Sequence, residues 1–394
     1  MSATKRILSI DAFRGITILT MVFVNELAGI RDIPEWMKHA HAKDDTMTFV
    51  DMVFPAFLFI VGMSIPFALN NRIKKGSDFL QLQWHIIWRT IGLLILGVFM
   101  VNGEGGNYNE AAMGMSIGLW LLLFYVCIIL VWNIYTFKNK TWVWCLRTIG
   151  IAGLIALAFI YRGGQNGDEY MKPRWWGILG LIGWAYLYAC ILFQLFKGNR
   201  WALLACVAFC ITWYIAGKTA YVSEHSGLHW VAAQAGNAAH TSIVLSGMVL
   251  SLIYFGNDSA LKRSFIEALL LAILFLVAGY LLRPYYKISK IYATPTWCLY
   301  SAAACTVLYS LLYWLIDVKG IKRWTAFFKP AATNPLLTYI IPDIIFALCL
   351  VLHISLIPDS LRYGMPGIIW SLCYAVVVMF IAMGLNKLKI RLQL

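Results

Sequence analysis

Residues 49–70 read FVDMVFPAFLFIVGMSIPFALN, and Asp51 is the only ionisable side chain in this stretch. A membrane-spanning helix needs about 20 mostly apolar residues, so the stretch is long and apolar enough to cross a bilayer. Runs of the same character recur along the whole chain. They predict twelve spans at about 12–30, 49–70, 84–102, 116–135, 142–161, 175–196, 201–217, 239–256, 264–282, 297–316, 335–354 and 366–386.

The composition supports the same fold class. Of the 394 residues, 61% are apolar (AVILMFWYC) and 13% are charged, whereas soluble domains have about 45–50% apolar and about 25% charged residues. This excess of apolar surface must face lipid, which excludes a soluble nucleic-acid binder and a disordered chain. We therefore expect an all-α polytopic bundle of about twelve helices (10–12) in a lipid bilayer, with residues 1–394 forming a single transmembrane domain.

The formal charge of +14 is explained by topology, and we expect no nucleic-acid partner. With the N-terminus inside, most of the 32 Lys and Arg residues fall on the inner side, as the positive-inside rule requires. Both termini are thus predicted to be cytoplasmic, and three long loops (31–48, 103–115 and 218–238) are predicted to be outside. The nine cysteines lie in apolar stretches without CxxC spacing, so we predict neither disulfides nor a metal site.

The polar residues around the first outer loop form the most concentrated candidate site. Asn25 and Glu26 end the first span, His39 and His41 lie in the loop, and Asp51 opens the second span. Two adjacent antiparallel helices would bring Asn25 and Asp51 to a similar depth. A histidine held by a carboxylate is suited to be a general base, and an amide can donate to a carbonyl oxygen. The competing interpretation is that these loop histidines are simply solvated.

Two other features are open to a structural or a functional interpretation. Asp11 and Arg14 lie three residues apart at the inner end of the first span, on one face of the helix. They form either an internal ion pair or part of a ligand site. Asp343 follows Pro342 within a span, where an acid must face protein or water. It either forms a structural hydrogen bond or lines a pathway.

The first 70 residues resemble the heparan-α-glucosaminide N-acetyltransferase family. The resemblance is carried by SIDAFRG at 9–15, MVFVN at 21–25, the pair His41-Ala42, Thr48, and DMVFP at 51–55. Phe57, Phe59, Gly62 and Ser64 extend it. RWWGIL at 174–179 and TNPLL at 333–337 are similar to later family segments, more loosely.

The resemblance implies a membrane enzyme that moves acetyl from cytosolic acetyl-CoA, its co-substrate, to the amine of a glucosamine-type acceptor on the far side, without a metal. It assigns catalytic roles to His41 as general base, Asn25, and Asp51. It also suggests a homodimer and, from the bacterial relatives, a location in the inner (plasma) membrane. The remaining candidates are Arg6, Asp11 and Arg14 for CoA, and Glu26, His39 and Trp36 for the sugar.

The chain departs from the family pattern at two places. Ala40 precedes His41 instead of a basic residue, and His39 is a second candidate base. Gly180 and Leu181 stand where the family often has a Gln-Arg pair.

We favour direct transfer in a ternary complex over an acetyl-histidine intermediate. Alternative functions are a secondary transporter of sugars or peptidoglycan fragments, for which a mid-span acid is typical, and an O-acyltransferase of a surface polysaccharide.

Overall fold

The computed structural model of the chain describes residues 7–137, 139–256 and 260–393. Within these residues the regular elements are helices, and β pairing is confined to isolated bridges. The helices are α1 (Leu8–Leu27), α2 (Val53–Lys74), α3 (Phe79–Glu104), α4 (Glu110–Met113), α5 (Ile117–Trp132), α6 (Lys140–Ile160), α7 (Ile178–Leu195), α8 (Arg200–Gly217), α9 (Ala220–Glu224), α10 (His229–Ala233), α11 (Ala235–Phe255), α12 (Leu261–Tyr286), α13 (Pro295–Tyr313), α14 (Lys329–Thr333), α15 (Pro335–Leu352) and α16 (Gly364–Lys387).

Eleven helical segments of the described residues are long and apolar enough to cross a membrane. They confirm the prediction of an all-helical polytopic bundle. The span predicted at 116–135 is the exception, because α5 has 16 residues. At about 1.5 Å per residue it falls short of the roughly 30 Å hydrocarbon core. The cytoplasmic placement of the termini stays a prediction.

The apolar surface has the distribution expected of a multi-pass membrane protein. Large side chains of α6 and α12, such as Ile155, Phe159, Leu270 and Val277, are exposed. In water such surfaces would be unfavourable, whereas lipid tails solvate them. By contrast, α11 is buried along most of its length.

The chain forms two compact units. The first unit comprises Met1–Thr17, Pro34–Thr90 and Leu181–Ala326, and the second comprises Ile18–Ile33, Ile91–Gly180 and Phe327–Leu394. Helices α1, α3 and α7 each contribute residues to both units. The prediction of one domain over residues 1–394 stays a prediction.

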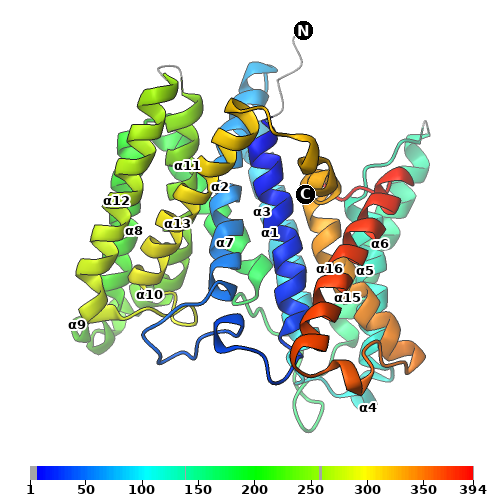
Figure 1. Cartoon of the computed structure of the whole chain (residues 1–394). Coiled ribbons are helices and arrows are strands. Elements are labelled where there is room, and N and C mark those ends of the chain that lie inside the picture. The colour runs from blue at the N-terminus through cyan, green and yellow to red at the C-terminus, as the bar shows by residue number, and fades with distance from the viewer. Residues whose placement is uncertain (1–6, 138, 257–259, 394) are drawn as a thin grey trace. The chain divides into compact units, whose positions relative to one another are not determined.

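In the first unit, α11 packs against α2 and α8, and α12 packs against α13 (Figure 1). The contact between α2 and α11 depends on two glycines. A Cβ atom at Gly62 would overlap the carbonyl group of Val244, and one at Gly247 would overlap the carbonyl group of Phe59. Small residues allow membrane helices to approach this closely, so the pair holds α2 directly against α11.

In the second unit, α5 packs against α6 and α15. An aromatic stack fills this core: the ring of Phe99 lies 5.5 Å from that of Trp120 and 4.9 Å from that of Phe124. The Trp120 indole N–H donates to the Leu157 carbonyl at 3.0 Å, so this buried polar group is satisfied.

The glycine contact predicts a difference between two identical substitutions on α11. Gly247→Ala is expected to lower the free energy of unfolding by about 1–3 kcal/mol, because the added methyl group meets backbone that has no room to move. Gly236→Ala is the control, since a Cβ there meets no atom within 4 Å. Thermal unfolding of the purified protein in detergent measures both. Equal stability of the two variants would contradict the α2–α11 contact.

Candidate active site

The candidate site is centred on the carboxylate of Asp51. Asp51 lies in the 3-10 turn Val50–Met52 that precedes α2, and its side chain is only 1% exposed. Its Oδ2 accepts backbone N–H groups from Ala40 at 3.1 Å and Thr48 at 3.2 Å. These bonds, at the amino-terminal end of a helix, compensate much of the cost of burying a carboxylate.

The other carboxylate oxygen of Asp51 holds a histidine. The ring Nδ1 of His39 lies 2.7 Å from Asp51 Oδ1. A buried carboxylate accepts hydrogen bonds, so we assign the hydrogen of this contact to Nδ1. The His39 side chain is 43% exposed. The arrangement is that of an imidazole oriented for proton transfer.

Lys290 is the third charged member of the site. Its Nζ lies 3.2 Å from His39 Nδ1 and 3.9 Å from Asp51 Oδ1. An ammonium group has donors only, so while Nδ1–H is donated to Asp51, Lys290 acts as a cation beside the pair. Burial lowers the pKa of Lys290 below its ordinary 10.5, although the charge of Asp51 acts in the opposite direction.

The segment 283–294 carries Lys290 and is fastened to the loop 39–51. Ser289 Oγ donates to the Ala42 carbonyl at 2.8 Å, and the Ile288 N–H donates to Asp45 Oδ1 at 2.8 Å. Arg283 also pairs with Asp45, at 3.1 Å. Two loops that are far apart in the sequence thus form one polar surface over Asp51.

Aromatic rings of α2, α11 and α13 lie beneath this surface. The Trp297 indole N–H donates to the backbone carbonyl of Asp51 at 3.3 Å. The ring of His240 lies 6.1 Å from that of Trp297 and 5.5 Å from that of Phe54. This packing gives the turn that carries Asp51 a rigid floor.

The structure differs from the predicted pairing of Asp51 with His41. His41 is exposed, and in the described residues its hydrogen bonds are made by its backbone, with Asp44. Asp51 instead contacts His39, because the backbone bonds of Ala40 and Thr48 close the loop with His39 over the carboxylate. The catalytic role that the resemblance implies for His41 stays a prediction, and the contact of His39 with Asp51 makes His39 the competing candidate for the base.

The other predicted site residues have defined places. Trp36 is 61% exposed, and its ring lies 5.6 Å from that of Phe49. Asn25 and Glu26 belong to the second unit, where the Trp370 indole N–H donates to Glu26 at 2.9 Å. Their predicted proximity to Asp51, and the role of Trp36 in sugar binding, stay predictions.

At the start of α1, the predicted contact between Asp11 and Arg14 is confirmed. Arg14 Nη1 lies 3.3 Å from Asp11 Oδ1, and Arg14 Nη2 donates to Ser64 Oγ of α2 at 2.7 Å. The pair therefore helps to join α1 to α2 within the first unit. Arg6, the other residue predicted to meet CoA, lies outside the described residues.

Lys290 and Trp297 were not predicted from the sequence. Lys290 is 251 residues from His39 along the chain, and no recognisable motif surrounds it in the sequence. Only the docking of segment 283–294 onto the first loop reveals its role.

The sequence model of a family described as Domain of unknown function (DUF5009) matches residues 6–237, more than half of the chain. The chain therefore belongs to this family.

Two curated relatives give a more distant relation. The heparan-alpha-glucosaminide N-acetyltransferase of Mus musculus is 35% identical over 101 residues, and that of Homo sapiens is 36% identical over 97 residues. These matches cover 26% and 25% of this chain, and they span only 15% and 14% of the relatives' length. They show a distant relation between this chain and these two proteins.

The docking of segment 283–294 gives a testable prediction. Asp45→Ala removes the acceptor of the Ile288 N–H, so amide hydrogen exchange at 286–290 is expected to become about tenfold faster, as the loss of a charge-assisted hydrogen bond implies. Asp44→Ala, at the neighbouring position, is the matched control and should leave this exchange unchanged. Mass spectrometry of the corresponding peptides measures the rates. Unaltered exchange in the Asp45 variant would show that the two loops are not fastened in this way.

Proposed function

We propose that the chain is a membrane acetyltransferase that moves acetyl from cytosolic acetyl-CoA to the amine of a glucosamine-type sugar. The observation that carries the proposal is the 2.7 Å contact between His39 Nδ1 and the buried Asp51. The names of the two relatives, which describe N-acetylation of a glucosaminide, support the choice of reaction.

Acetyl transfer to an amine needs a base. The attacking nitrogen forms a bond to the thioester carbonyl carbon, and it must lose a proton as it does so. His39 Nε2 takes this proton, while Asp51 stabilises the resulting imidazolium through Nδ1–H. When the carbon–sulfur bond breaks, the proton passes from the imidazolium to the CoA thiolate. Asp51 thus has the same role as the acid behind the histidine of a catalytic triad.

The thioester oxygen gains negative charge when the amine attacks. Lys290, 3.2 Å from the His39 ring, supplies a positive charge beside this reaction, and a preorganised donor of this kind lowers the barrier. Because the base acts directly on the acceptor amine, the proposal retains a ternary complex without an acetylated enzyme.

The acetyl donor is proposed to enter from the side rich in Lys and Arg. CoA is anionic, and the predicted orientation places most basic residues on the cytoplasmic side. Arg6, Asp11 and Arg14 remain the candidates for its nucleotide part. The contact of Arg14 with Ser64 would set the direction of the guanidinium group.

A pair of variants distinguishes the roles of the two loop histidines. His39→Ala is expected to lower acetyl transfer by at least about 100-fold, the usual effect of losing a general base, whereas His41→Ala should retain most of it. Purified protein, labelled acetyl-CoA and D-glucosamine provide the assay, and His225→Ala, an exposed loop histidine of the same unit, is the control. The reverse order of effects would assign the base to His41. Full activity of both variants, or glucosamine uptake into vesicles without an acyl donor, would refute the proposed function.

The pH profile tests the contribution of Lys290. Because its pKa lies below the ordinary lysine value, its charge is present at low pH and is lost as the pH rises through that lowered pKa. We expect kcat/KM to fall on the alkaline side for this reason. In Lys290→Arg the fall should shift to higher pH, because a guanidinium has a pKa above about 12.

A matched control for this profile is Lys287→Arg, an exposed lysine of the same segment, which should keep the wild-type profile. An unchanged alkaline limb in Lys290→Arg would remove Lys290 from the mechanism.

A further inference from the structure

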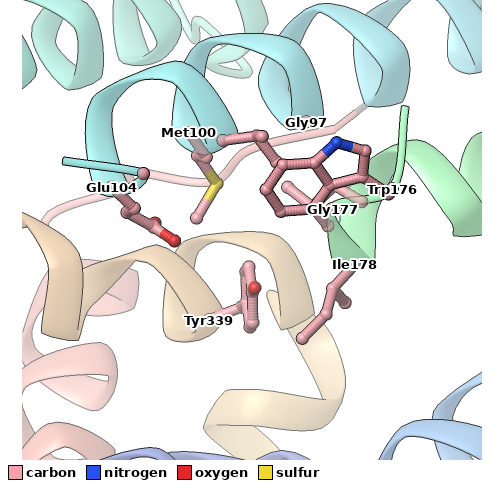
Figure 2. Close-up of a pocket in the computed structure, with 10 residues that line it drawn as sticks. Gly97, Met100, Glu104, Trp176, Gly177, Ile178 and Tyr339 are labelled. Carbon is pink, nitrogen blue, oxygen red and sulfur yellow. The ribbon is translucent and has the colours of Figure 1, made fainter. Parts of the chain in front are cut away.

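The second unit contains a cavity that the mechanism above does not use. Its volume is about 390 Å³, and Met100, Glu104, Trp176, Ile178 and Tyr339 are among the residues that line it (Figure 2). Pockets for small molecules commonly measure about 300–1,000 Å³, so this cavity has room for one sugar ring. All of its lining residues belong to the second unit.

One end of the cavity is acidic. Glu104, the last residue of α3, directs its carboxylate toward the space beside Tyr339 (Figure 2). Asp343 of α15 is a second acid of this unit. Among the described residues, neither carboxylate takes part in an ion pair. A cationic group also lies near this end of the cavity. A guanidinium nitrogen of Arg174 is 3.8 Å from the position that a Cβ atom would take on the lining residue Gly105.

The Glu104 carboxylate is exposed at this end of the cavity, whereas Asp343 is half-buried. A carboxylate that has no ion-pair partner and borders a cavity can form a charge-assisted hydrogen bond with a cationic ligand. The preference for a cation therefore rests on Glu104.

The opposite side of the cavity is aromatic. Trp176 is 63% exposed, and its indole ring borders the cavity across from Tyr339 (Figure 2). An aromatic face packs against the C–H groups of a sugar ring and attracts cations. A carboxylate and an aromatic ring on one small cavity together match a ring that carries an ammonium group.

We propose that this cavity binds the ammonium form of a hexosamine, with Glu104 paired to the ammonium group and Trp176 packed on the ring. The choice of a sugar rests on the proposed function, and the preference for a cation rests on the cavity alone. The site distinguishes substrate from product, because an N-acetylated sugar carries an uncharged amide. Glu104 recognises the amine and is not its base, since the ammonium form cannot attack a thioester.

Direct binding measurements test this proposal. Equilibrium dialysis of the purified full-length protein with labelled D-glucosamine, N-acetyl-D-glucosamine and D-glucose gives the three affinities. The wild-type protein is expected to prefer D-glucosamine by about tenfold or more, as one charge-assisted hydrogen bond implies. Glu104→Gln should abolish this preference, whereas Trp176→Ala should weaken the binding of all three sugars. Asp168→Asn, an exposed acid of the same unit, is the matched control and should bind like wild type.

The outcomes separate this inference from the proposed function. Equal affinities for the three sugars, no measurable binding of D-glucosamine, or an unchanged preference in Glu104→Gln would each overturn the inference. If the amine preference depends on Glu104 but no acetyl transfer occurs, the cavity is a hexosamine site and the proposed enzyme activity is wrong.

Discussion

The buried carboxylate of Asp51 is the group on which the organisation of the first unit's polar surface depends. A carboxylate that is 1% exposed requires hydrogen-bond donors and a nearby positive charge, because burial removes its water. The chain meets this requirement with the backbone of Ala40 and Thr48, the ring of His39 and the ammonium group of Lys290. The need to satisfy one acid thus brings together two distant loops, and it fixes the orientation of one imidazole ring.

The same residues serve stability and chemistry in different ways. Trp297 donates to the backbone of Asp51 and belongs to the buried core, so it supports the turn from below. The side chains of His39 and Lys290 are 43% and 28% exposed, so both are more accessible than Asp51. In the proposed mechanism, a rigid floor beneath these partly exposed groups would hold the base in position. The close contact between α2 and α11 at Gly62 and Gly247 extends this rigidity into the helices.

Much of the fold follows from the sequence, because long apolar runs have few alternatives in a membrane. The span predicted at 264–282 corresponds to α12, Leu261–Tyr286, and even the polar contact of Asp11 with Arg14 follows from helical spacing. The length of α5 does not follow from the sequence in this way, because the apolar residues after Trp132 belong to the loop that follows the helix.

In the site, Asp51 and the presence of a loop histidine are predictable, whereas the choice of His39 over His41 depends on loop closure. His39 and His41 are two residues apart in a loop of irregular backbone, so no periodic sequence pattern indicates which of them faces Asp51. No local sequence pattern indicates that Lys290 lies beside them.

The central claim is that an imidazole held by Asp51 meets the acetyl group of CoA. The most direct measurement is a cryo-electron microscopy map of the purified protein with a non-transferable acetyl-CoA analogue. The account predicts that the CoA moiety enters from the Lys- and Arg-rich side and that its acetyl carbonyl lies beside His39, with room for an amine between them. An acetyl group bound far from this ring, with His39 facing bulk solvent, would contradict the account.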